Sequence, residues 1–319
     1  MVESWWWPFI VLAVASFSYG CQSADPVGKE LGPVPRVDGG QALGYVAQIL
    51  DCGPRYSGSA GAACARARVR TVLEASGWLV EEWAWTQETP RGAVEMVNLG
   101  ARLPGIPQGR PKVLLCGHYD TKSLDEYPEF LSANDGGSST GLLMELGSVL
   151  AQHGSDLGLD VRILFFDGEE CVTEYGPRDG LFGSRRFAQA AETAAWREGV
   201  LVALVLDMVG DAHLTVTLPR DTAGWLAKKV FAAAERAGVR EAFGYAAGSI
   251  LDDHVPLIQA GIAAVDIIDF HYGSRPGAND YWHTDQDTLD KLSAESLAAV
   301  GNVVLEMLWV GEIGLRPPP

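Results

Sequence analysis

The sequence predicts a single α/β domain in which a central, mostly parallel mixed β-sheet is covered by helices on both faces. Three observations predict this fold class. Apolar runs return from residue 43 to residue 310 with only short gaps, which favours one domain, although a hydrophobic content of 47% would also suffice for two small ones. The central runs are continuously apolar, as is typical of strands covered on both faces. Segments with a helical pattern separate these runs, as in a sheet connected by helices.

The individual elements follow from these patterns in chain order. Helices are expected over 41–50 and 59–76, and Gly77 ends the second. Two strands follow over 79–85 and 96–103, separated by the turn-rich stretch 87–92. The apolar runs of the central sheet are 113–116, 161–166, 200–206 and 263–268. Further helices are expected over 141–152, 180–191, 222–237 and 289–309.

The N-terminal region differs in composition from the rest. Residues 5–19 form an uncharged apolar run that is too short for a membrane span, and a polar, Pro/Gly-rich stretch follows it. This pattern predicts a signal peptide over 1–20, a flexible tether over 21–39, a folded domain over 40–312 and a tail over 313–319. The Gly20-Cys21 junction resembles a bacterial lipoprotein cleavage site. We therefore expect an exported protein, either periplasmic or anchored to a membrane through a lipid on Cys21; lipidation itself stays open.

The charge of the chain argues against nucleic-acid binding. Asp and Glu total 41 against 24 Lys and Arg, which gives a net charge of −17. The sequence contains no Lys/Arg cluster that could neutralise a run of phosphates.

The five cysteines lack the spacing of a zinc knuckle. Cys52 and Cys64 lie close in sequence, and an oxidising compartment would permit a disulfide between them. Two ordinary small buried residues explain the pair equally well.

Acidic residues or histidines stand at the end of each central apolar run. Ligands of open α/β sheets bind beyond the carboxyl ends of the strands, so these side chains are expected to meet at one edge. Histidine nitrogens and carboxylate oxygens are also the ligands of catalytic zinc. The candidate residues are His118, Asp120, Asp135, Glu169, Glu170, Asp207 and His283.

Each candidate also has a simpler explanation when taken alone. An aspartate before two glycines, as Asp135 is, is usually a turn or helix N-cap residue. Adjacent Glu169 and Glu170 would usually be a solvated pair, but here they follow a strand that should be buried. Together, the strand-end placements favour a built site.

The complete set resembles the two-zinc aminopeptidase superfamily, over about residues 40 to 312, which implies a phosphorylase/hydrolase-like fold. The resemblance rests on His118-x-Asp120, Asn134-Asp135-Gly136-Gly137, Glu169-Glu170, Asp207 and His283. It implies that Asp135 bridges two zinc ions and that Glu169 is the general base. It places His118 and Asp207 on one zinc ion, and Glu170 and His283 on the other.

Within that superfamily, the sequence is more similar to the animal-type glutaminyl-peptide cyclotransferases, which also occur in bacteria. The motifs that carry this likeness are His118-Tyr119-Asp120-Thr121-Lys122, Phe165-Phe166-Asp167-Gly168-Glu169-Glu170 with Leu181-Phe182-Gly183-Ser184-Arg185, Asp252-Asp253-His254-Val255-Pro256 and Trp282-His283-Thr284. Three positions depart from the family pattern: Tyr175 replaces a Trp, Asp266 replaces a His that bacterial members also exchange for Asp, and Leu251 replaces a polar residue.

This resemblance implies an enzyme that converts the N-terminal Gln of peptides or proteins to pyroglutamate and releases ammonia. One zinc ion would be held by Asp135, Glu170 and His283 and would act as a Lewis acid on the side-chain amide. Glu169 would move the protons. The predicted supporting residues are Asp207 and Asp252, which would orient Glu169, and Trp282 and Lys122, which would bind the substrate.

Two other functions remain to be compared. A two-zinc aminopeptidase would carry its second zinc ion on His118 and Asp207 and would remove N-terminal residues. A non-enzymatic binding domain should have lost ligands, and this sequence retains every ligand of the motif set.

Overall fold

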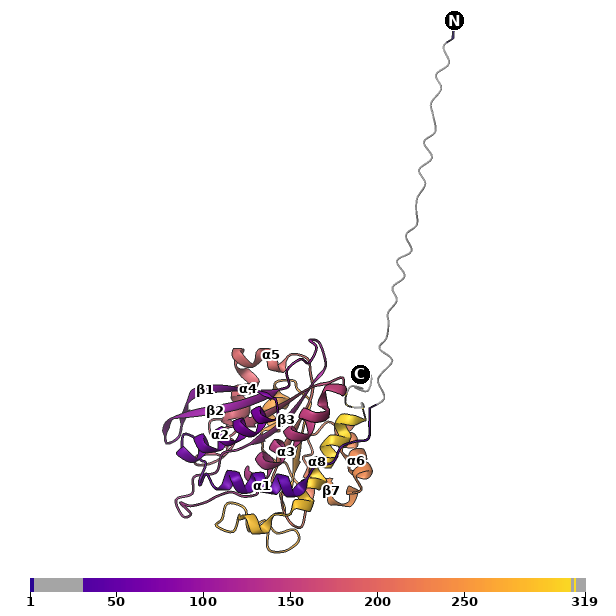
Figure 1. Ribbon diagram of the computed structural model, residues 1–319. Helices are drawn as coiled ribbons and strands as arrows, with labels where there is room; N and C mark the ends of the chain where they lie inside the picture. Colours follow the sequence, from indigo (N-terminus) through magenta and orange to yellow (C-terminus); the bar gives the residue numbers. More distant parts are fainter. Residues whose placement is uncertain (3–30, 311–312, 314–319) are drawn as a thin grey trace. The chain divides into compact units, whose positions relative to one another are not determined.

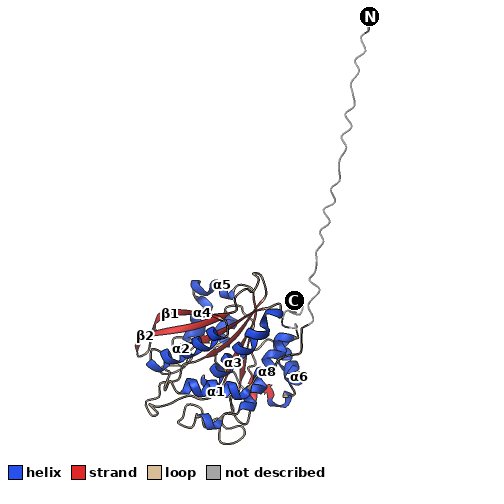
Figure 2. Cartoon of the chain, viewed as in Figure 1, coloured by secondary structure: helices blue, strands red, loops and turns tan. Residues whose placement is uncertain are grey.

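The computed structural model describes residues 1–2, 31–310 and 313. The apolar run at 5–19 and Cys21 therefore lie outside the described residues. Within the described part, the strands form a single eight-stranded sheet. Figures 1 and 2 show strands in the interior with helices packed around them. The strands are β1 (Leu79–Thr89), β2 (Gly92–Arg102), β3 (Lys112–His118), β4 (Asp160–Phe166), β5 (Val200–Asp207), β6 (Val216–Leu218), β7 (Phe243–Tyr245) and β8 (Ala264–Ile268).

The sheet is mixed, with a parallel centre. Its strand order is β1-β2-β4-β3-β5-β8-β6-β7. The four central strands β4, β3, β5 and β8 are parallel. The β1–β2 hairpin joins β4 in antiparallel register, and β6 pairs antiparallel to β8 at the other side. The predicted mostly parallel mixed sheet is confirmed.

Helices cover both faces of this sheet. One face carries α1 (Gly39–Leu50), α2 (Ala60–Ala75), α3 (Gly137–His153), α6 (Gly224–Ala237) and α8 (Ala294–Trp309). The other carries α4 (Phe182–Gln189), α5 (Ala194–Arg197) and α7 (His254–Gln259). Short 3-10 helices lie at Gly154–Asp156, Ala191–Thr193, Arg240–Ala242 and Leu289–Lys291.

Alternate residues of the central strands face opposite helix layers. In β3, Val113 and Leu115 pack under α1, α3 and α8, whereas Leu114 and Cys116 pack under α4 and α7. All four side chains are fully buried. Because both faces are covered, the strand reads as one continuous apolar run.

Some predicted boundaries were wrong. The stretch 87–92, predicted as a turn, is mostly strand: Gln87 pairs with Val94 and Thr89 with Gly92, so only two residues form the turn. Polar side chains are compatible with strand here because the outer part of the hairpin is largely exposed. Helix α3 begins four residues before the predicted 141, in a run of Gly, Ser and Thr with low helix propensity. Helix α8 was predicted from residue 289 but begins at Ala294, because Ser293 is its N-cap and accepts a hydrogen bond from the Ser296 backbone amide.

The packed chain extends past the predicted domain limits of 40 and 312. Leu31 and Val34 pack against the core, Val37 is buried, and Asp38 caps α1 by accepting a hydrogen bond from the Gln41 backbone. Ile313 is also buried in this core. The residues assigned to the tether therefore include a packed segment.

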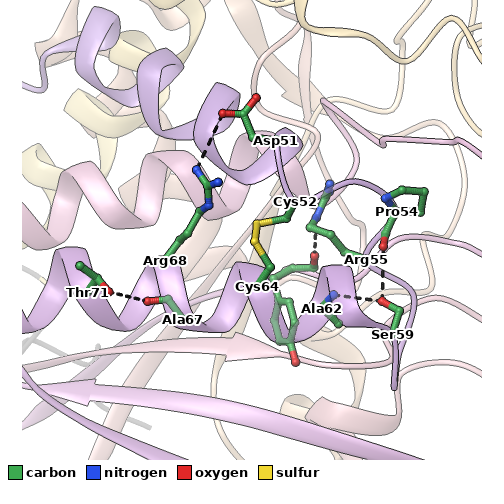
Figure 3. The surroundings of a disulfide bond; sticks show 11 residues. Asp51, Cys52, Pro54, Arg55, Ser59, Ala62, Cys64, Ala67, Arg68 and Thr71 are labelled. Atoms are coloured by element: carbon green, nitrogen blue, oxygen red, sulfur yellow. Dashed lines mark hydrogen bonds and ion pairs between the residues drawn. A yellow bond between two sulfur atoms is a disulfide. The ribbon is translucent and has the colours of Figure 1, made fainter.

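Cys52 and Cys64 form a disulfide, which decides between the two alternatives left open by the sequence (Figure 3).

None of the described helices has the length and apolarity needed to cross a bilayer.

Candidate metal centre and active-site cavity

The fold brings the polar strand-end residues to one edge of the sheet. β3 ends at His118, β5 ends at Asp207, and the chain after β4 carries Glu169 and Glu170. Because β4, β3 and β5 are adjacent and parallel, these ends lie side by side. Asp135 enters from the loop before α3.

Two groups of side chains that could hold a metal ion share Asp135. In the first, His118 Nε2 lies 3.2 Å from Asp135 Oδ1 and 3.2 Å from Asp207 Oδ1. In the second, His283 Nε2 lies 3.2 Å from Asp135 Oδ2 and 3.1 Å from Glu170 Oε1. Asp135 thus presents one oxygen to each histidine.

The donor set fits zinc. Each group offers one imidazole nitrogen and two carboxylate oxygens, a combination that binds zinc and leaves a fourth position open. Bond lengths of about 2.0–2.1 Å in a tetrahedron place ligand atoms about 3.3 Å apart. The observed histidine–carboxylate separations of 3.1–3.2 Å are close to that spacing. In both groups, the histidine nitrogen therefore stands at zinc-ligand spacing from both carboxylates.

Two further carboxylates hold the ligand-bearing segments in place. Asp120 accepts hydrogen bonds from the backbone amides of Glu169 and Glu170, at 3.2 and 3.3 Å, and so ties the end of β3 to the end of β4. Asp287 accepts hydrogen bonds from the Asn134 and Asp135 amides, at 2.7 and 3.2 Å. Burial raises the pKa of Asp287 to about 7.

The backbone around Asp135 leaves its carboxylate free for the centre. The N-cap of α3 is Gly136, which provides no side-chain cap, so Asp135 does not cap the helix. Gly136 has a φ of 73°, and a Cβ there would lie 2.8 Å from the Asp120 carbonyl oxygen and 2.8 Å from His118 Cε1. A glycine is needed for the loop to approach His118 this closely.

Glu169 is buried next to the second group, and its partner is Tyr175. The Tyr175 hydroxyl lies 2.9 Å from Glu169 Oε2, 3.2 Å from Glu169 Oε1 and 3.1 Å from Glu170 Oε2. Burial raises the pKa of Glu169 well above its ordinary value, while His118 opposes this shift. The sequence marked Tyr175 only as a departure from a family pattern and gave no indication of this contact.

A cavity of about 300 Å³ opens beside the centre. Its walls contain Asp135, Glu169, Tyr175, Asp207, Asp252 and Trp282, together with the apolar Ile250, Leu251, Ile268 and Phe270. Trp282 stacks on His283, with 3.9 Å between the ring centroids. Glu169, the predicted base, and Trp282, predicted to bind the substrate, therefore line the same cavity.

Of the predicted supporting residues, Asp207, Asp252 and Trp282 line this cavity, whereas Lys122, predicted to bind the substrate, does not. Asp207 contacts His118 in the first metal-binding group. Asp252 lines the cavity, and burial together with Asp207 raises its pKa to about 6. Lys122 lies behind Glu170, with Nζ 3.6 Å from Glu170 Oε2, and donates a hydrogen bond to the Cys171 carbonyl. Lys122 lines a neighbouring hollow with Tyr56 and Phe130.

A mixed α/β sheet with two histidines and two further carboxylates around one shared aspartate at its edge is the architecture of the zinc-dependent exopeptidase type. The sequence profile of peptidase family M28 matches residues 98–308. The chain belongs to peptidase family M28.

The chain is also similar to glutaminyl-peptide cyclotransferases and glutaminyl cyclases. The chain is 30% identical over 257 residues to the glutaminyl-peptide cyclotransferase-like protein of Bos taurus. The matched region covers 69% of this chain but only 63% of that relative's length. The structure resembles that of Acidobacteriales bacterium glutaminyl cyclase, with a TM-score of 0.78, 30% identity and coverage of 88% of this chain and 96% of that one. It also resembles a Zn-dependent exopeptidase from Parabacteroides distasonis, with a TM-score of 0.77, 27% identity and coverage of 86% and 99%. The predicted family resemblance is confirmed.

Proposed function

We propose that this protein is a zinc-dependent glutaminyl-peptide cyclotransferase, acting on the N-terminal Gln of peptides or proteins. The observation that carries the proposal is the position of Glu169. Its buried carboxylate lines the cavity directly beside the group formed by Asp135, Glu170 and His283. The similarity to solved glutaminyl cyclases over nearly their whole length supports the same reaction.

Asp135, Glu170 and His283 would hold one zinc ion, and the metal would supply Lewis-acid polarisation of the substrate's side-chain amide carbonyl. Glu169 takes a proton from the α-amine as the nitrogen attacks that carbonyl carbon. It then returns a proton to the departing nitrogen, so that ammonia leaves and a five-membered lactam remains. Tyr175 holds the Glu169 carboxylate in position through its hydroxyl. Nucleophile and electrophile belong to the same substrate residue, so the protein only has to fold that residue.

The cavity walls suit a folded Gln side chain. Trp282 and Phe270 pack against each other, with ring centroids 5.2 Å apart, and Ile250 and Ile268 belong to the same apolar cluster. These groups exclude water from the reacting amide, while Asp207 and Asp252 face it from the polar side. We propose that both carboxylates orient Glu169 from the cavity wall.

The second candidate is a two-zinc aminopeptidase. The first group, His118 with Asp135 and Asp207, would take the second zinc ion. The likeness to a Zn-dependent exopeptidase favours this alternative. Metal content separates the two: the cyclotransferase is expected to bind about one zinc ion per chain at saturation, and the aminopeptidase two. Release of ammonia from a Gln-peptide supports the first function, and release of free amino acids supports the second.

We also propose that the protein is exported and that Cys21 carries a lipid anchor. The uncharged run before Gly20-Cys21 and the Cys52–Cys64 disulfide, which needs an oxidising compartment to persist, support this location. Detergent partitioning of the wild type and of Cys21→Ala tests the anchor. Equal partitioning into the aqueous phase would refute it.

A further inference from the structure

The Cys52–Cys64 disulfide closes a loop that lies against the segments carrying the metal ligands. Cys52 follows the end of α1, and Cys64 lies in the first turns of α2 (Figure 3). Arg55 and Ser57 project from this loop. Each contacts backbone or side chains next to a candidate ligand position, and neither lines the active-site cavity.

Arg55 joins two of these segments through its guanidinium group. The side chain is fully buried. Its Nε donates to the Tyr119 carbonyl at 2.9 Å, one residue after His118. Its two terminal nitrogens donate to the carbonyls of Leu131 at 2.7 Å and Ser132 at 3.0 Å, on the loop that leads to Asp135.

Ser57 contacts the segment that follows β4 and carries Glu169 and Glu170. Its hydroxyl donates to Asp167 Oδ1 at 2.6 Å, two residues before Glu169. The Tyr119 hydroxyl donates to Asp167 Oδ2 at 2.8 Å, so the same carboxylate also meets the β3 exit. The disulfide-closed loop therefore contacts the chain after β3, the loop before α3 and the chain after β4.

Several features fix the shape of this loop. Ser59 caps α2 by accepting from the Ala62 amide at 3.0 Å, and its hydroxyl donates to the Pro54 carbonyl at 3.3 Å (Figure 3). A Cβ at Gly61 would lie 2.0 Å from that Pro54 oxygen, so the loop folds tightly onto the helix. The disulfide adds a covalent restraint that removes open conformations of the loop.

The charge of Arg55 also matters for the centre. Burial lowers the pKa of Arg55 to about 10, against the opposing effect of Asp287, Asp120 and Asp135. The guanidinium therefore stays charged at neutral pH and faces the carboxylates that form and support the site. A neutral side chain at this position would leave three backbone carbonyls without donors and these carboxylates without a buried cation.

We propose that Arg55 is a positioning residue for the metal centre and that the Cys52–Cys64 disulfide raises metal affinity by holding Arg55 in place. This inference rests on the zinc centre proposed above, but not on the choice between cyclotransferase and aminopeptidase. Because coupling between two equilibria is reciprocal, bound zinc should in turn make this disulfide harder to reduce.

The test is the zinc affinity of the metal-free protein, measured by competition with a chromophoric chelator well below the melting temperature. Arg55→Met should raise the dissociation constant ~10–100-fold, as is typical when groups that orient ligands are lost. Arg55→Lys should give a smaller rise, because an ammonium cannot reproduce the planar fork that reaches three carbonyls. The double variant Cys52→Ser/Cys64→Ser should shift the constant in the same direction.

The matched control is Arg236→Met, which breaks an ion pair between α6 and α8, where Arg236 Nε lies 3.1 Å from Glu306 Oε2. This variant should melt earlier and keep the wild-type zinc affinity. Wild-type affinity in folded Arg55→Met and in the double cysteine variant would overturn the proposal and leave Arg55 and the disulfide as stabilising groups only. If Arg55→Met does not fold, the double cysteine variant decides alone. A wild type that binds no zinc would overturn both the proposed centre and this inference, whereas zinc binding without cyclisation would affect only the proposed reaction.

Discussion

Exchanging Glu169 for Gln separates proton transfer from metal binding. The two side chains have the same size, and the Tyr175 hydroxyl can still donate to the amide oxygen of a Gln, so the packing should be retained. The variant lacks a group that can accept and return a proton. We expect turnover of a Gln-peptide to fall ~10²–10⁴-fold, which corresponds to about 3–5 kcal/mol of activation free energy.

The adjacent residue provides the matched control for this change. The atoms that face the histidine of the second group belong to Asp135 and Glu170, not to Glu169. Glu169→Gln should therefore bind zinc as the wild type does, while Glu170→Gln should lose both zinc and activity. Ammonia release measures the reaction, and elemental analysis after dialysis measures the metal. Activity of Glu169→Gln within a few-fold of the wild type, with zinc bound, would refute the role of Glu169 as the base.

Three further predictions follow from the same geometry. His283→Ala and Asp135→Ala should lower zinc occupancy as well as activity, and full occupancy in both, by elemental analysis, would contradict the ligand assignment. Tyr175→Phe removes the hydrogen bond that the hydroxyl donates to the Glu169 carboxylate, worth about 1.5–3 kcal/mol, and should lower kcat ~10-fold or more with zinc retained; an unchanged kcat would show that the hydroxyl does not position Glu169. Asp269, a buried residue that directly follows β8 and accepts hydrogen bonds from the Thr215 and His271 amides, tests the effect of burial on pH dependence. Burial raises its pKa to about 6, so its ionisation favours the unfolded chain, and stability is lost as the pH rises from about 4 through 6. Denaturant titrations of the metal-free protein measure the free energy of unfolding. The difference in this free energy between Asp269→Asn and the wild type should grow by on the order of 2 kcal/mol from pH 4 to pH 7. A difference that stays constant with pH would contradict this.

The central features of the fold could be predicted from the sequence because they depend on local patterns. Continuous apolar runs such as 113–116 identify strands covered on both faces, and polar residues at their ends identify the site edge. Two strands of three residues, β6 and β7, are too short to give a periodic signal. The start of α3 was missed because tertiary burial outweighs the low helix propensity of its first residues.

The clustering of the ligand candidates, and Asp120 beside them, could be predicted, whereas the other groups that hold them could not. His118, Glu170 and Asp207 stand at strand ends, where a general rule applies. Arg55 contacts carbonyls 64 to 77 residues further along the chain, and nothing in its local sequence indicates this. The contact of Asp287 with the Asn134 amide spans 153 residues. Such contacts arise only when the folded chain brings distant loops together.

The most direct test of the proposed function is the mass of the products from a mixture of two peptides that differ only in the N-terminal residue, Gln or Leu. The zinc-loaded protein is incubated with both peptides together, so that each serves as the control for the other. The proposed function predicts that the Gln-peptide loses one ammonia and keeps its length, while the Leu-peptide stays intact. Shortening of either peptide by its first residue, with no loss of ammonia, would contradict the cyclotransferase and establish the aminopeptidase.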